Sequence, residues 1–388
     1  MPHGRATSQP EARRPTALCR WGLAAALMAQ APFALAQSAP PPDRIPLVTG
    51  LILGSVLHAP IGEREDLLEI GSADSTGVHY AWHERTIIDG DTTTGFRRRF
   101  VSANDLAGAP RFDSVFGTDE QKRPGFTAVS LSSAVYRQLR DAGSAPFSMI
   151  VNREPGGPKA GDVPSLGAMF GPGRERYKGT LTRVSPQPER FPLLLNGSRA
   201  TVPAMHVKGS FTAGLRRSEW DLWVQADSAH PLVLKSVLEE KVFQMVRADL
   251  PVTKTPGPGT TADGGMLAEE LKARCRVELP GVYFAFGTAT IDPISDRALA
   301  QLARSLAGHP DWKFTVEGHT DSVGTDEANR SLSLRRAEAV RARLAEQHGL
   351  NTRAWGAMGY GATRPKESNA TIEGRARNRR VELVRDCR

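Results

Sequence analysis

Residues 318–340, GHTDSVGTDEANRSLSLRRAEAV, contain a polar loop that joins a predicted strand to a long predicted helix. The strand is KFTVEGH, residues 313–319, and the loop after it is rich in the small polar residues that favour turns. Gly324 permits a positive φ, and Thr325 or Asp326 can cap the N-terminus of the helix. This stretch therefore predicts a strand–loop–helix unit.

The predicted helix carries an arginine on its apolar face. The residues that share this face at helical spacing are Asn329, Leu332, Ser333, Arg336, Ala337, Val340 and Leu344. An unpaired guanidinium on such a face is costly to desolvate. We interpret Arg336 either as a side chain that extends to solvent, or as an anion-binding group on the rim of a pocket whose other wall carries Asp321. A carboxylate and a guanidinium on one rim would suit a zwitterionic ligand.

Five blocks in order along residues 279–383 resemble the OmpA-like peptidoglycan-binding domain, which is found in outer membrane protein A and in peptidoglycan-associated lipoproteins. The blocks are VYFAFGTATI, GHTDSVGT, NRSLSLRRAEAV, GYGATRP and NATIEGRARNRRVEL. The resemblance implies a mixed sheet with two principal helices on one side. The sequence departs from many members at residues 284–287, Phe-Ala-Phe-Gly, where those members carry an aspartate.

The resemblance also implies the ligand and the residues that bind it. Asp321 and Arg336 would grip meso-diaminopimelate, the zwitterionic residue of the peptidoglycan stem peptide. Asn329 is expected to tie the loop to the start of the helix or to touch the ligand, and one arginine of the run at 379–380 to lie near the pocket, unless this run is only a basic turn. The predicted ligand-binding residues are Asp321, Arg336, Thr320, Asn329, Leu332 and Arg380.

The N-terminus, residues 1–36, has the features of an export signal. Arginines precede the apolar run WGLAAALMAQAPFALA, which ends in an Ala-Leu-Ala cleavage pattern and is too short for a comfortable membrane span. A Pro-rich leader follows at residues 37–46. We therefore expect an exported, periplasmic protein, associated with the outer membrane or the cell wall.

Residues 47–252 predict a β-rich antiparallel domain. Alternating apolar and polar residues occur in VHYAWHERTII, FTAVSLS, AMHVKGSF and SEWDLWVQAD, with one predicted helix near residues 134–142. Residues 253–265, TKTPGPGTTADGG, have the composition of a flexible linker, so we expect this domain to be tethered to the next one. Residues 266–388 then alternate strands and helices, with a first strand expected at residues 282–291 and a loop expected before the last strand at residues 379–385. This pattern makes the predicted fold a two-domain, mixed α+β architecture with an α/β sandwich at the C-terminus.

Signal cleavage would leave two cysteines, Cys275 and Cys387, which bracket the C-terminal domain. In an oxidising compartment an even pair favours a disulfide, and two free thiols are the alternative. In the resembled fold the first and last strands are antiparallel neighbours, which would bring the two sulfur atoms within bonding range.

The chemistry-bearing residues predict a binding protein and not an enzyme. No nucleophile motif or metal-ligand spacing accompanies residues 319–321, His-Thr-Asp, so we expect no catalytic residues, no metal and no cofactor. The net charge of +8 is not gathered into one basic stripe with interleaved aromatic residues, which argues against nucleic-acid binding. The leading prediction is a non-covalent peptidoglycan anchor whose β-rich domain contacts an envelope protein or lipid. The alternative is a wall-localised enzyme or a lipid- or ligand-binding protein with its activity in residues 47–252.

Overall fold

The computed structural model of the chain describes residues 43–59, 62–88, 91–114, 116–152, 174–251, 264–285 and 287–387. Residues 39–388 form one compact unit. The predicted signal segment lies outside the described residues, as do the leader up to residue 42 and the predicted linker up to residue 263. None of the helices that the structure describes has the length and apolarity that a membrane span requires.

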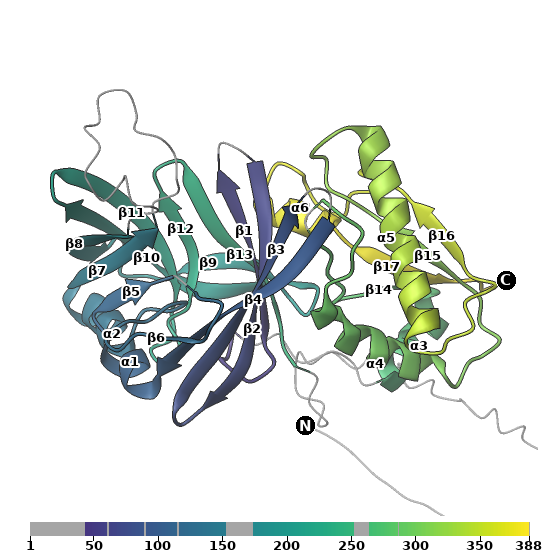
Figure 1. The fold of residues 1–388 in the computed structure, drawn as a ribbon, viewed down its shortest axis with the longest axis horizontal. Coiled ribbons are helices and arrows are strands. Elements are labelled where there is room, and N and C mark those ends of the chain that lie inside the picture. The colour runs from purple at the N-terminus through teal and green to yellow at the C-terminus, as the bar shows by residue number, and fades with distance from the viewer. Residues whose placement is uncertain are drawn as a thin grey trace, which may run out of the picture. The chain divides into compact units, whose positions relative to one another are not determined.

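A single 13-stranded sheet makes up the β-rich region (Figure 1). Its strands are β1 (Ile52–Ala59), β2 (Gly62–Asp74), β3 (Gly77–Ile88), β4 (Asp91–Ser102), β5 (Arg111–Asp113), β6 (Gln121–Lys122), β7 (Ser144–Asn152), β8 (Arg174–Arg183), β9 (Glu189–Leu195), β10 (Ser198–Ala213), β11 (Arg216–Gln225), β12 (Val233–Leu238) and β13 (Lys241–Asp249). They lie in the order β5-β7-β8-β10-β11-β12-β13-β1-β2-β3-β4-β6, and β9 pairs with β10 and β13. The long neighbouring strands pair antiparallel, as the alternation in the sequence predicts.

Among its described residues, this region also has two helices, α1 (Ala103–Gly108) and α2 (Ser133–Ala142). The predicted helix near residues 134–142 is α2, which Ser132 caps and Gly143 ends in the left-handed conformation. The predicted strand FTAVSLS is wrong: its residues make only isolated bridges, from Thr127 to Phe112 and from Ser130 to Leu232. The described end of the Pro-rich leader is held in place, because Ile45 is fully buried and exchanges backbone hydrogen bonds with the side chain of Gln225.

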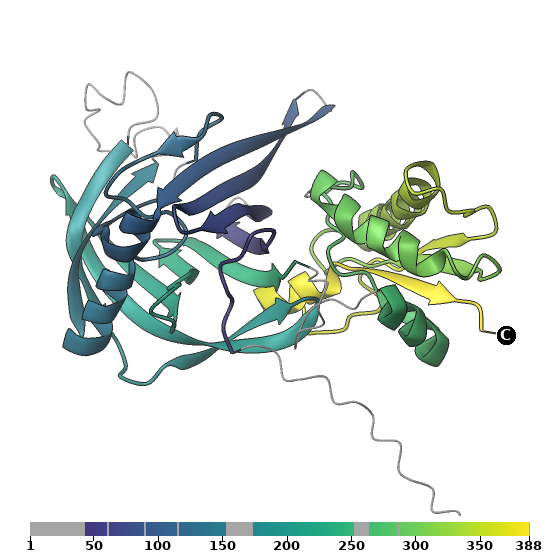
Figure 2. The same ribbon diagram turned by 90° about the horizontal axis from the view of Figure 1, so that it is seen from below.

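The C-terminal region forms a four-stranded mixed sheet with helices packed against it (Figure 2). Its elements are α3 (Gly264–Arg274), β14 (Arg276–Glu278), the 3-10 turn η2 (Pro293–Ser295), α4 (Asp296–Leu306), β15 (Phe314–Gly318), α5 (Asp326–Glu346), β16 (Gly356–Gly359), α6 (Ile372–Asn378) and β17 (Val381–Arg385). The strand order is β14-β17-β15-β16, in which β15 and β16 are parallel and β17 is antiparallel to both of its neighbours. Leu302 of α4 and Val340 of α5 share one buried cluster with Val316 of β15.

Three local predictions in this region need correction. The first block of the resemblance, residues 282–291, is not a strand: Phe284 bridges Ile291 across a turn in which Gly287 has φ +69°, and the first strand is the shorter β14. The segment before the last strand contains the helix α6, which Thr371 caps, where a loop was expected. Gly264 and Gly265, the end of the predicted linker, begin helix α3.

Gly318, the last residue of β15, lies where the sheet touches helix α5. A Cβ atom at this position would stand 2.0 Å from the backbone oxygen of Ser333, which cannot move without disturbing the helix. We expect Gly318→Ala to lower the free energy of unfolding by at least about 1–3 kcal/mol, measured by urea denaturation. Gly308→Ala is the matched control, because a Cβ atom there meets nothing within 4 Å. Equal stability of the two variants would contradict this packing.

Candidate functional site

The loop between β15 and α5 is held by its own side chains. Thr325 caps α5 by accepting a hydrogen bond from the amide of Ala328, and Gly324 has φ +95°. The Oδ1 atom of Asp321 accepts a hydrogen bond of 3.0 Å from the amide of Val323. Asn329 donates from its side-chain amide to the carbonyl of Val323 at 3.0 Å, so it ties the loop to the helix. This contact matches the first of the two roles that the sequence left open for Asn329.

Arg336 projects from α5 and is only 8% exposed. Its Nε atom donates a 2.9 Å hydrogen bond to the carbonyl of Thr288, and its guanidinium carbon lies 5.0 Å from the centre of the Phe284 ring. Burial lowers the pKa of Arg336 to about 10, so the guanidinium remains charged at neutral pH. The buried arginine on the apolar face therefore does not extend to bulk solvent, and it lines a pocket together with Phe284 and Ala285.

Asp321, which the sequence placed on the other wall of this pocket, is not among the described residues that line it, and Arg379 connects the pocket to the loop. Arg379 is the residue after α6, and its guanidinium donates a 2.6 Å hydrogen bond to Oδ2 of Asp321 while the residue also lines the pocket beside Arg336. The predicted residue Arg380 also lines the pocket, but its Nε atom donates to Glu382 at 2.6 Å. Of the two arginines in the run that the sequence singled out, Arg379 is therefore the one that contacts Asp321.

Thr320 and Leu332 lie on either side of the loop. Thr320 is buried, and its amide donates a 3.0 Å hydrogen bond to the carbonyl of Gly361. Its hydroxyl has no hydrogen-bond partner in the described part of the chain. Leu332 is half-buried on α5, one turn before Arg336. Their contact with a ligand stays a prediction.

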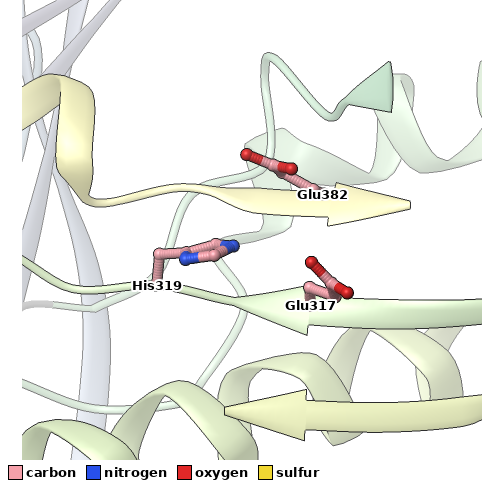
Figure 3. A group of neighbouring side chains, drawn as sticks. All are labelled: Glu317, His319 and Glu382. Carbon is pink, nitrogen blue, oxygen red and sulfur yellow. The ribbon is translucent and has the colours of Figure 1, made fainter. Parts of the chain in front are cut away.

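Glu317, His319 and Glu382 form a buried cluster next to the loop (Figure 3). One potential ligand atom from each lies within 4.8 Å of the others, a spacing that suits a metal ion. The surrounding charges oppose this use. Arg276 pairs with both carboxylates, Lys366 and Arg380 pair with Glu382, and Arg364 lies 3.7 Å from Glu317.

These cations outnumber the two carboxylates and already neutralise them. Burial alone would raise the pKa of Glu382, but the hydrogen bonds from Arg276, Arg380 and Lys366 outweigh it and lower that pKa to about 2. A divalent cation would have to displace guanidinium and ammonium groups from both acids. We therefore interpret the cluster as an ion-pair network that fixes β15 to β17 below the loop.

The surroundings of His319 favour a neutral imidazole ring. Burial, followed by the positive charge of Arg380, lowers the pKa of His319 to about 4. The ring stacks on Tyr360 at 5.5 Å between centroids, and neither ring nitrogen has a hydrogen-bond partner among the described residues. Protonation of His319 would add a fifth cation to a site that already holds three arginines and one lysine.

We expect the buried ring of His319 to make the folded protein less stable as the pH falls through the mildly acidic range. The pKa of about 4 in the folded state lies below the ordinary value of 6.5, so the unfolded chain binds the proton first. The contribution of the neutral ring to the free energy of unfolding is complete above about pH 6.5 and is lost as the pH falls towards 4. His319→Gln should flatten the fall in melting temperature across this window relative to the wild type, whereas His309→Gln in the same domain should not. Parallel pH profiles for wild type and His319→Gln would contradict the assignment.

The mixed sheet, its helices and the charged loop before α5 make the C-terminal region an α/β domain with a charged pocket. Residues 283–379 match the OmpA family, so the chain carries an OmpA-family domain, as the motifs predicted. This match lies within the C-terminal region and includes the loop, α5 and α6.

The similar proteins include an outer membrane porin, a peptidoglycan-binding protein and a peptidoglycan-associated lipoprotein. Outer membrane porin F of Pseudomonas aeruginosa is 48% identical over 107 residues, which cover 28% of this chain and 30% of that protein. Peptidoglycan-binding protein ArfA of Mycobacterium bovis is 35% identical over 131 residues, which cover 33% of this chain and 38% of that protein. The chain thus spans about a third of the length of these curated relatives. The peptidoglycan-associated lipoprotein of Burkholderia pseudomallei is 33% identical in a match with a TM-score of 0.26, which covers 27% of this chain and 88% of that one.

Proposed function

We propose that the chain is a periplasmic envelope protein whose C-terminal domain binds peptidoglycan without altering it. The observation that carries the proposal is a pair of buried, opposite charges at the positions of the family motif, Asp321 on the loop and Arg336 on α5. The name of the ArfA relative, a peptidoglycan-binding protein, supports the same substrate.

The ligand within the wall is meso-diaminopimelate of the stem peptide. Its free end carries an ammonium and a carboxylate on one carbon, and these need an anion and a cation close together. Arg336 supplies the cation, because a guanidinium can bind a carboxylate through two parallel hydrogen bonds. Asp321 supplies the anion, and Arg379, which pairs with Asp321 at 2.6 Å, holds it in place.

The β-rich region is the part that such an anchor would retain at the wall. We propose that it contacts an envelope protein or lipid, and that binding, not catalysis, is the function of the whole chain. The predicted export signal and the envelope proteins among the relatives support this location.

Competition with small free compounds tests the ligand. We expect meso-diaminopimelate to release the protein from purified peptidoglycan in a co-sedimentation assay, because it presents the same zwitterion as the stem peptide. 1,5-Diaminopentane is the matched control, since it keeps the carbon chain and both ammonium groups of diaminopimelate but has no carboxylate for Arg336 to bind. Equal release by both compounds, or by neither, would count against recognition of diaminopimelate.

A further inference from the structure

Residues of both regions line the pocket that contains Arg336, and one of them is a carboxylate of the β-rich region. Glu65 on β2 lines the same pocket as Arg336 and Arg379. Its Oε2 atom accepts a 3.2 Å hydrogen bond from Nε of Arg379. The Nη1 atom of the same arginine donates to Asp321. The side chain of Glu65 is 23% exposed, so its carboxylate is largely removed from water.

The position of Glu65 follows from a match between strand and helix spacing. Residues 63 and 65 point to the same face of β2, and residues 375 and 379 lie one turn apart on α6 and at its end. Two ion pairs result: Glu63 pairs with Arg375, and Glu65 pairs with Arg379. The two acids are therefore presented in register to the two arginines.

Apolar contacts flank these ion pairs. Val56 and Val246 of the β-rich region share a buried cluster with Ala376 of α6. At the pocket itself, Ile52 and Leu67 share a buried cluster with Tyr283. Buried apolar area stabilises a contact in a way that salt does not screen, so this contact does not depend on exposed charges alone.

Three guanidinium groups surround the carboxylate of Glu65. Burial raises its pKa, but the charges of Arg379, Arg247 and Arg336 outweigh this effect and lower the pKa below its usual range. These are the surroundings that a carboxylate ligand of this pocket would need. Glu65 therefore has the charge and the location of the ligand group that we assign to Arg336, with its own hydrogen bond made to the neighbouring Arg379.

We propose that Glu65 occupies the carboxylate subsite of the C-terminal domain, so that the β-rich region and peptidoglycan compete for it. This inference rests on the proposed function. It makes wall binding conditional: the stem peptide binds only when Glu65 leaves Arg379 and Arg336, and a partner that draws the β-rich region away would increase the affinity for the wall.

The test uses the full chain with one substitution. Glu65→Gln keeps the size of the side chain and removes the charge that competes with the ligand. Because the apparent affinity falls with the fraction of molecules in the binding-competent state, we expect this variant to bind purified peptidoglycan about tenfold more tightly than the wild type in co-sedimentation. Glu219→Gln, an exposed position on β11, is the matched control and should bind like the wild type.

A second measurement is independent of peptidoglycan. Without any ligand, Glu65→Gln should speed amide hydrogen exchange in the loop at 321–325 and in α6, because the contact that covers them is weakened. Unchanged hydrogen exchange in Glu65→Gln would overturn the inference, whether or not the domain binds peptidoglycan. Unchanged or weaker wall binding by Glu65→Gln, while Arg336→Ala abolishes binding, would overturn the inference and leave the proposed function standing.

Discussion

Arg336→Ala and Asp321→Ala are each expected to abolish co-sedimentation with purified peptidoglycan. Arg336 is 8% exposed and Asp321 is 7% exposed, so each would meet the ligand in a largely desolvated site. Loss of one partner from such a charge pair costs about 2–5 kcal/mol, and each 1.4 kcal/mol is a factor of about ten in affinity. A micromolar interaction would then fall to a level that sedimentation does not detect.

The controls separate a lost ligand contact from a lost fold. Arg335→Ala removes the neighbouring, exposed arginine of α5, and Asp311→Asn removes an exposed acid of the same domain, so both variants should sediment like the wild type. Because Asp321 also pairs with Arg379, Asp321→Asn should accompany Asp321→Ala, and each variant needs a melting curve. Wild-type sedimentation by a folded Arg336→Ala would show that the ligand binds elsewhere.

The loop and α5 were predictable because short-range signals decide them. The cap at Thr325, the positive φ at Gly324 and the helical spacing up to Leu344 all depend on residues within a few positions of one another. The helical spacing also placed Arg336 on the apolar face, but it did not decide between a side chain that extends to solvent and one that lines a pocket. The same reasoning failed at residues 282–291, because apolar alternation predicts an extended segment but does not show that Gly287 turns the chain back.

The remaining features of the site depend on contacts between distant residues. The choice between Arg379 and Arg380 could not be made from the sequence, since adjacent residues differ only in which partner the fold brings near: Asp321 for one, Glu382 for the other. Glu65 is separated from Arg379 by 314 positions, and its strand carries several other acids. The in-register pairs with 375 and 379 become visible only when β2 and α6 are placed side by side.

The disulfide between Cys275 and Cys387 provides the prediction with the largest effect on stability. Its Cα atoms are 6.1 Å apart, and it joins the start of β14 to the end of β17, which are antiparallel neighbours. The resemblance predicted this pairing, and the structure contains it, although the first strand is β14 and not the segment at 282–291.

Reduction of this bond is expected to lower the melting temperature of the C-terminal domain by on the order of 10 °C. The bond closes a loop across 112 positions, for which loss of chain entropy in the unfolded state corresponds to about 4–5 kcal/mol as an upper figure. Without it, β14 keeps only a short pairing with β17, and the C-terminus after Arg385 is free to fray. Arg276 pairs with Val384, next to this end of β17, and its side chain forms ion pairs with Glu317 and Glu382. The ion-pair network below the loop between β15 and α5 should therefore loosen as well.

Calorimetry with and without reductant measures the effect, and the double variant Cys275→Ser, Cys387→Ser controls for the reductant itself. The variant should melt like the reduced wild type and should show no further change when reductant is added. Protein from an oxidising compartment should contain no thiol that alkylates at either position. Full alkylation of both cysteines, or a melting temperature that reduction leaves unchanged, would mean that the bond does not form or does not stabilise the domain.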